Sequence, residues 1–237
     1  MRSRPSDLPL LFVEGADDVS VVAGLLKRHG YDTEKGLKHL HIESLSGLKE
    51  LLDAMQDIIK AQRGWPCGFV FDIDIEIKDR WQAVADRLKF TGDLTTTLST
   101  LIDPSCPAKG YIGRVEGYPH PFGVWLMPDC ASDHKKLEDL IKTLIPNNHP
   151  LKLFAETTTH GAAKIVDDAN ALASGEVVWK RFTASDTIKA VVRTWLAWQN
   201  EPGVAFGAAL NSKILGHDSA EARAFLDWMS RLRIYFL

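Results

Sequence analysis

LPLLFVEGADD, at residues 8–18, is the segment of this chain that carries the most structural information. Its four apolar residues at positions 10–13 indicate a short buried strand, which ends abruptly at Glu14. Asp17 and Asp18 follow, and apolar residues then recur at helical spacing, so we expect a helix to begin here. Ligands of open α/β sheets bind outside the carboxyl ends of the strands, and Glu14 would lie at that edge.

A second segment, GFVFDIDIE at residues 68–76, is again an apolar strand that ends in acids at alternating positions. If the two strands are parallel neighbours, their acids converge on one edge of the sheet. The acids concerned are Glu14, Asp18, Asp72, Asp74 and Glu76. Carboxylates gathered in this way raise one another's pKa unless a cation neutralises them, and oxygen ligands suit Mg²⁺ or Mn²⁺. The alternative is that the first acids only favour a helix N-terminus, while the second group forms a solvated turn.

VEGADD and FDIDIE resemble the two acidic motifs of the TOPRIM domain, which occurs in primases, topoisomerases, recombination proteins and the overcoming-lysogenization-defect (OLD) nucleases. The first motif of that superfamily is Glu-Gly with an Asp four residues after the Glu, which corresponds to Glu14 and Asp18. The second is Asp-x-Asp-x-acid, which corresponds to Asp72, Asp74 and Glu76. VWLMPDC followed by LEDLI, and IKAVVRTWLAWQNEPGVAFGAAL, are similar to a poorly characterised bacterial TOPRIM-like family of about this length. Only the two acidic motifs carry a functional meaning.

The resemblance implies a metal-dependent phosphoryl-transfer enzyme, with a Mg²⁺- or Mn²⁺-dependent nuclease acting on DNA or RNA as the first expectation. Asp72 and Asp74 would bind the metal, Glu76 would assist directly or through water, and Glu14 would be a ligand or the general acid/base. Resemblance to the OLD nucleases also suggests a role in defence against phage or mobile DNA. The chain has no Gly-x4-Gly-Lys-Ser/Thr loop, so a partner chain would have to supply any ATPase. The alternatives are a non-catalytic binding or regulatory module and a nucleotide phosphohydrolase.

Two further acids, Asp129 and Glu138, follow a later strand. In nuclease members of the TOPRIM superfamily, acids beyond the two core motifs can help to hold a second metal, and Glu138 matches an acidic position of the closer family. The alternative for Glu138 is a surface acid paired with Lys135 or Lys142 at helical spacing. Arg80, by contrast, is expected on the first turn of a helix, outside the metal site.

Basic residues of the last third are candidates for a phosphate-facing surface. They are Lys164, Lys180, Arg181, Lys189 and Arg193. Lys189 is the first choice, because it lies near the start of a helix expected at residues 184–199, where a cation is unfavourable to the helix dipole. Lys189 would therefore gain from an acidic or phosphate neighbour, and it is the catalytic candidate for neutralising the charge that develops on the phosphate. The alternative for each of these residues is an ordinary solvated helix face.

Composition places the chain among ordinary globular proteins: 237 residues, 45% hydrophobic and 25% charged, with a net charge of -3. The three cysteines, Cys67, Cys106 and Cys130, show no metal-type spacing and cannot all pair, which favours a reducing cytoplasm. No signal peptide and no apolar run of membrane-spanning length is evident, so a cytoplasmic protein is expected.

The spacing of apolar residues predicts strands that alternate with helices, which implies parallel pairing with right-handed crossovers. The expected strands are 10–13, 37–45, 68–72, 111–115 and 122–127. The expected helices begin near 19, 48, 78, 133, 149, 184 and 219, and a polar loop is expected over 91–110. We therefore predict an α/β, TOPRIM-like, mostly parallel sheet flanked by helices over residues 6–146. Residues 147–237 are predicted to form a helical C-terminal extension packed on that core.

Overall fold

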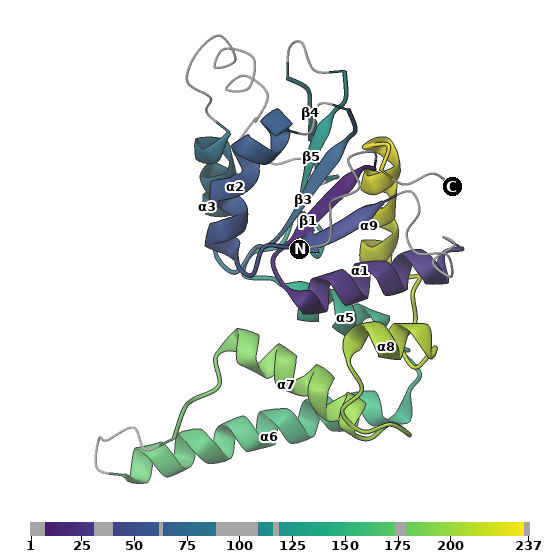
Figure 1. Ribbon diagram of the computed structural model, residues 1–237. Helices are drawn as coiled ribbons and strands as arrows, with labels where there is room; N and C mark the ends of the chain where they lie inside the picture. Colours follow the sequence, from purple (N-terminus) through teal and green to yellow (C-terminus); the bar gives the residue numbers. More distant parts are fainter. Residues whose placement is uncertain are drawn as a thin grey trace.

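The computed structural model describes residues 8–30, 40–61, 64–88, 109–115, 119–173 and 179–234. Their strands form a five-stranded sheet in the order β2-β1-β3-β5-β4 (Figure 1). The strands are β1 (Leu10–Val13), β2 (His41–Ser44), β3 (Cys67–Asp72), β4 (Tyr111–Gly113) and β5 (Phe122–Met127). All the pairings are parallel except that of β4 with β5 at one edge. The prediction of an α/β protein with a mostly parallel sheet is confirmed.

Helices cover both faces of this sheet. The helices of the described residues are α1 (Ala16–Arg28), α2 (Leu48–Ala61), α3 (Ile77–Arg87), α5 (Leu137–Leu144), α6 (Pro150–Leu172), α7 (Ala184–Ala197), α8 (Phe206–Asn211) and α9 (Ala220–Arg231). In Figure 1, α2 and α3 lie on one face, and α1 and α9 lie on the other. Because both faces are covered, β1 and β5 are buried along their whole length, which explains their uninterrupted apolar sequences.

Most of the predicted elements are present with small shifts at their ends. The exception is the helix expected near residue 133, which begins only at Leu137, because the preceding residues form a turn that bonds to the chain after β3. Thr183 caps the N-terminus of α7 by accepting a hydrogen bond from the Asp186 N–H. The loop expected over residues 91–110 lies outside the described residues except for Lys109 and Gly110.

The last two helices complete the core of the first half of the chain. A Cβ added to Gly123 of β5 would lie 2.6 Å from Leu232 and 2.9 Å from the Trp228 ring, so α9 approaches the sheet too closely for any side chain there. Trp228 is fully buried, and its indole N–H donates to the Tyr111 carbonyl at 3.0 Å. Gly207 of α8 lies so close to the Ser20 carbonyl of α1 that a side chain would not fit there either. The hydrophobic core therefore extends past residue 146, whereas α6 and α7 project beyond α5 (Figure 1).

The connections of the sheet identify where a ligand would bind. From β1 the chain passes through α1 to β2 on one side, and then through α2 to β3 on the other side of β1. The strand order therefore reverses between β1 and β3. In open α/β sheets the ligand crevice lies outside the carboxyl ends of the strands at this point. Glu14 and Asp72 are the residues at those two ends.

Candidate metal centre

The first side of the candidate site is built by the turn from β1 into α1. Glu14 follows β1, and its Oε1 accepts a hydrogen bond of 2.8 Å from the backbone N–H of Asp72. Asp18 folds back so that its Oδ2 accepts from the Gly15 N–H at 3.0 Å, and its side chain is buried. A Cβ on Gly15 would lie 3.1 Å from that same oxygen, so a larger residue here would press on the Asp18 carboxylate.

The second side is the end of β3 and the turn that follows it. Oδ1 of Asp72 accepts from the backbone N–H of Leu137, the first residue of α5, at 2.9 Å. The strand stops at Asp72, because the N–H groups of Ile73 and Asp74 both donate to the Lys135 carbonyl, at 2.9 and 3.1 Å. Asp74 has a positive φ of 53°, and its Oδ1 lies 2.5 Å from Nζ of Lys136. A turn, and not a continuing strand, therefore places Asp74 beside Asp72.

Helix α7 closes the third side with two ion pairs. Nζ of Lys189 lies 3.2 Å from Oε1 of Glu138 on α5, and Glu138 is largely buried. One helical turn further on, Arg193 lies 3.1 Å from Asp17 at the start of α1. Lys189, which was predicted to bind phosphate, thus pairs with Glu138, which was predicted to bind metal.

Burial and mutual repulsion raise the pKa values of the central acids. Burial is the main cause that raises the pKa of Glu14 to about 7, and the charges of Asp18 and Asp74 add to it. The Asp72 N–H and the Arg80 guanidinium oppose this rise. The pKa of Asp18 rises to about 6, again chiefly through burial, with a contribution from Glu138. The pKa of Asp72 lies well above its ordinary value because of burial and of the Asp18, Glu14 and Asp74 charges.

These couplings show which predicted residues the fold gathers. Asp18 and Asp74 repel both Glu14 and Asp72, Glu14 and Asp72 repel each other, and Glu138 repels Asp18; we call these five residues the acidic cluster. Glu14 and Asp72 lie at the ends of two parallel strands, Asp18 lies in the first turn of α1, Asp74 in the turn after β3, and Glu138 at the start of α5. Four of the five acids that the two sequence motifs grouped lie in this cluster, and Glu76 does not; Glu138 interacts with it through Asp18.

Glu76 and Asp129 lie in different surroundings. Glu76 occupies the N-cap position of α3, is about half exposed, and lies 2.7 Å from Nζ of Lys78. Asp129 follows β5 and stabilises its own turn: Oδ1 accepts from the N–H groups of Ala131 and Ser132, and Oδ2 accepts from the Ser132 hydroxyl. Both carboxylates therefore have local partners: Glu76 pairs with Lys78, and Asp129 bonds within its own turn.

Two basic residues belong to the site although the sequence did not assign them to it. Arg80 is buried, donates from Nε to the Ile73 carbonyl at 3.2 Å, and lowers the pKa of Glu14. The expectation that it lies outside the site is therefore wrong. Burial lowers the pKa of Lys136, but contact with Asp74 and the charges of Asp72 and Glu138 raise it above its ordinary value overall. A pair of lysines before a helix carries no sequence signal for such a contact.

The chemistry of the acidic cluster fits a divalent cation, although its present arrangement serves other contacts. Its donors are carboxylate oxygens, which Mg²⁺ and Mn²⁺ prefer, and a cation would relieve the repulsion that raises their pKa values. Among the described residues, however, no three His, Cys, Asp or Glu side chains are already placed to hold a metal ion. Asp72, Asp74 and Glu138 instead contact a backbone N–H and two lysines.

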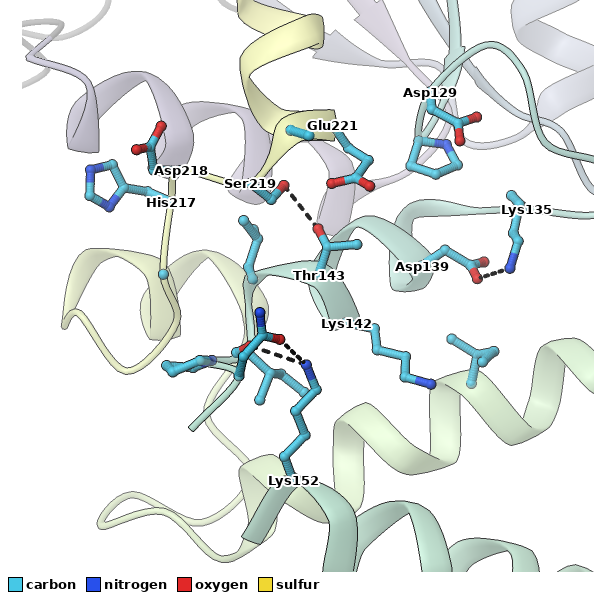
Figure 2. Close-up of a pocket in the computed structure, with 18 of the residues that line it drawn as sticks. Asp129, Lys135, Asp139, Lys142, Thr143, Lys152, His217, Asp218, Ser219 and Glu221 are labelled. Atoms are coloured by element: carbon cyan, nitrogen blue, oxygen red, sulfur yellow. Dashed lines mark hydrogen bonds and ion pairs between the residues drawn. The ribbon is translucent and has the colours of Figure 1, made fainter. Parts of the chain in front are cut away.

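A cavity of about 840 Å³ lies along the other side of α5 (Figure 2). Its lining includes Asp129, Lys135, Asp139, Thr143 and Ser219. Lys135 and Asp139 form an ion pair of 2.9 Å there. Their sequence neighbours face the acidic cluster instead: Lys136 pairs with Asp74, and Glu138 is a member of the cluster. The start of α5 thus separates the acidic cluster from the cavity.

Comparisons with known proteins place the chain in a family. No curated protein and no solved structure matches it significantly. In the part of the chain that the structure describes, no helix has the length and apolarity needed to cross a membrane. One family model, described as a protein of unknown function (DUF3226), matches residues 9–234, almost the full length of the sequence. The chain therefore belongs to the DUF3226 family.

Proposed function

We propose that this protein is a Mg²⁺- or Mn²⁺-dependent phosphoryl-transfer enzyme that cleaves nucleic acid. The observation that carries the proposal is the contact between Glu14 and the Asp72 N–H at the point where the strand order reverses, with the charges of Asp18 and Asp74 acting on both acids. The resemblance of VEGADD and FDIDIE to the TOPRIM motifs supports the same reading.

The residues have distinct roles in this proposal. Asp72 and Asp74 hold the metal, and Asp18 and Glu138 complete the negative field around it. A metal bound there would stabilise the charge that develops on the phosphate oxygens. Glu14 is the general acid/base at the scissile phosphate. In the metal-free protein, burial raises its pKa to about 7, and a bound cation would lower it. Arg80 keeps that pKa from rising further.

A nucleotide phosphohydrolase is the second candidate, and the surface charges favour it. All five basic residues that the sequence offered for a phosphate-facing surface are paired with acids. The pairs are Lys164–Asp168, Lys180–Asp186, Arg181–Asp167, Lys189–Glu138 and Arg193–Asp17. Long nucleic acids depend on such cations for much of their affinity, whereas a nucleotide needs only the site itself.

The resemblance alone carries two wider biological proposals. A role in defence against phage or mobile DNA, and a partner chain that supplies an ATPase, follow from the likeness to the OLD nucleases. A cytoplasmic location follows instead from the three cysteines, which show no metal-type spacing and cannot all pair.

A cleavage panel tests the proposed activity. Supercoiled, linear and single-stranded DNA, RNA and nucleoside triphosphates are incubated with the protein and Mg²⁺, Mn²⁺ or EDTA. We expect metal-dependent product from at least one substrate, abolished by Asp72→Asn. Asp129→Asn is the matched control, because Asp129 follows the neighbouring strand but bonds within its own turn. If Asp72→Asn binds Mg²⁺ and cleaves like the parent, the proposal is wrong. If Asp72→Asn loses the Mg²⁺ binding of the parent, but the parent cleaves no substrate of the panel, the site is a binding module.

A further inference from the structure

Two lysine ammonium groups lie on carboxylate oxygens that the proposed metal would need. Nζ of Lys136 is 2.5 Å from Oδ1 of Asp74, and both side chains are about one-third exposed, at 30% and 32%. Nζ of Lys189 is 3.2 Å from Oε1 of Glu138, but Lys189 is more exposed, at 57%. An ammonium on a carboxylate oxygen competes with a divalent cation for that oxygen and repels it, so each disfavours the other at the same carboxylate.

The backbone around Lys136 is fixed, which confines any exchange to its side chain. The Lys136 N–H donates to Oδ2 of Asp139 at 3.0 Å, and the next N–H, that of Leu137, donates to Asp72 at 2.9 Å. Lys136 is also the N-cap residue of α5. The lysine side chain itself has a flexible four-carbon stem. It can therefore leave Asp74 while α5 and Asp72 stay in place.

We propose that Lys136 is a displaceable counter-ion: a divalent cation that binds Asp72 and Asp74 expels the Lys136 ammonium, which then contacts a phosphate oxygen of the substrate. The inference rests on the proposed function and adds an order of binding to it. Without metal, the lysine is held by Asp74 and the remaining acids repel an anion. With metal, the anion meets a cation and a released ammonium at the N-terminal end of α5, where the helix dipole also favours negative charge.

Thermodynamic linkage makes this arrangement measurable. If metal binding releases the lysine for phosphate, metal must tighten phosphate binding, and phosphate must tighten metal binding by the same factor. Removal of the lysine has opposite effects on the two ligands. The metal loses a competitor and binds more tightly, whereas phosphate loses a partner and binds more weakly. A lysine with only a structural role would not separate the two affinities in this way.

The test is calorimetric titration of the full-length protein with Mg²⁺ alone, and then with inorganic phosphate in the absence and presence of saturating Mg²⁺. For Lys136→Met we expect Mg²⁺ to bind roughly two- to fivefold more tightly, the size of one partly exposed ion pair. We expect phosphate affinity in the presence of Mg²⁺ to fall about tenfold, the loss of one charge-assisted hydrogen bond. Lys136→Arg, which keeps the charge, should retain the coupling between the two ligands.

Lys135→Met is the matched control. It removes the same charge one residue away, but Nζ of Lys135 lies 2.9 Å from Asp139 on the cavity side of α5 (Figure 2). Its Mg²⁺ affinity should equal that of the parent, and melting curves will show that each variant is folded. If Lys136→Met binds Mg²⁺ no more tightly than Lys135→Met while the parent binds Mg²⁺, the counter-ion exchange is overturned and the proposed function stands. If the parent binds no Mg²⁺, the proposed function itself fails.

Discussion

The backbone N–H of Asp72 donates a hydrogen bond of 2.8 Å to Oε1 of Glu14. This contact joins the ends of two parallel strands, β3 and β1, across 58 positions of sequence. It fixes one oxygen of Glu14 beside the carboxyl group of Asp72, so the two acids share one buried environment. Their pKa values are raised together for this reason, and pH becomes a direct probe of the acidic cluster.

Glu14→Gln should stabilise the metal-free protein at high pH and leave its stability almost unchanged at low pH. Glu14 has a folded-state pKa of about 7 against an ordinary value of 4.5, so the native state binds this proton more tightly than the unfolded state does. Stability is therefore unaffected below the ordinary pKa, falls as pH rises towards 7, and stays reduced above it. Glutamine can still accept the Asp72 hydrogen bond but carries no charge.

Melting temperatures of the parent and of Glu14→Gln, measured in EDTA from pH 4 to pH 9, check this prediction. The two curves should coincide near pH 4 and separate by several degrees above pH 7. Glu76→Gln is the control, because Glu76 lies beside Lys78 in an exposed position. Parallel curves for the parent and Glu14→Gln across the whole range would contradict the raised pKa.

Arg80→Met should move the pH dependence of Mg²⁺ binding to higher pH. The buried guanidinium lowers the pKa of Glu14, so its removal lets that pKa rise further above 7. Metal binding must displace protons from the acidic cluster, and apparent affinity therefore rises with pH until the acids are ionised. Calorimetric titration with Mg²⁺ between pH 5.5 and pH 9 gives the midpoint of this rise. Arg87→Met should leave it in place, because Arg87 lies on the same helix but pairs with Asp53.

The convergence of the acids could be predicted from sequence because it depends on few assumptions. Each strand is a short apolar run that ends in carboxylates, and the carboxyl ends of parallel neighbours meet at one edge. The alternation of residues 72–76 also grouped Glu76 with Asp72. That grouping of Glu76 would hold on a continuing strand, whereas the strand ends at Asp72, the chain turns at Asp74, and Glu76 lies at the start of α3.

Contacts between distant segments carry no comparable sequence signal. Lys136 reaches Asp74 only because residues 134–137 bond to the turn after β3, through the Lys135 carbonyl and the His134 N–H. Arg80 has a helical position that fits solvent as well as burial, and only the close approach of α3 to Ile73 decides between them. Likewise, a glycine inside an apolar strand normally weakens that strand, but Gly68 and Gly123 are the positions where α9 packs against the sheet.

Trp228→Ala should destabilise the whole protein and not only its C-terminal end. The ring is fully buried against Trp125 and Phe225, and its N–H bonds to β4. Loss of a buried tryptophan typically costs about 3–5 kcal/mol. Urea unfolding followed by far-ultraviolet circular dichroism should give a single transition at lower urea concentration. Trp198→Ala, at the exposed end of α7, should change the midpoint little. Loss of α9 alone, with the sheet retained, would show that the core ends before residue 147.

Asp74→Asn should abolish the stabilisation by Mg²⁺ while it preserves the fold. The positive φ of 53° at this position suits asparagine, which adopts the left-handed region readily, so the variant removes charge without adding backbone strain. In EDTA the lost ion pair with Lys136 is offset by weaker repulsion on Glu14 and Asp72, so the melting temperature should change little. In the parent, millimolar Mg²⁺ should raise the melting temperature by mass action, because the ion binds only the native state. Asp74→Asn should show no such rise, and Asp79→Asn, on the first turn of α3, should show the full rise. An equal rise in the parent and in Asp74→Asn would place the metal elsewhere on the protein.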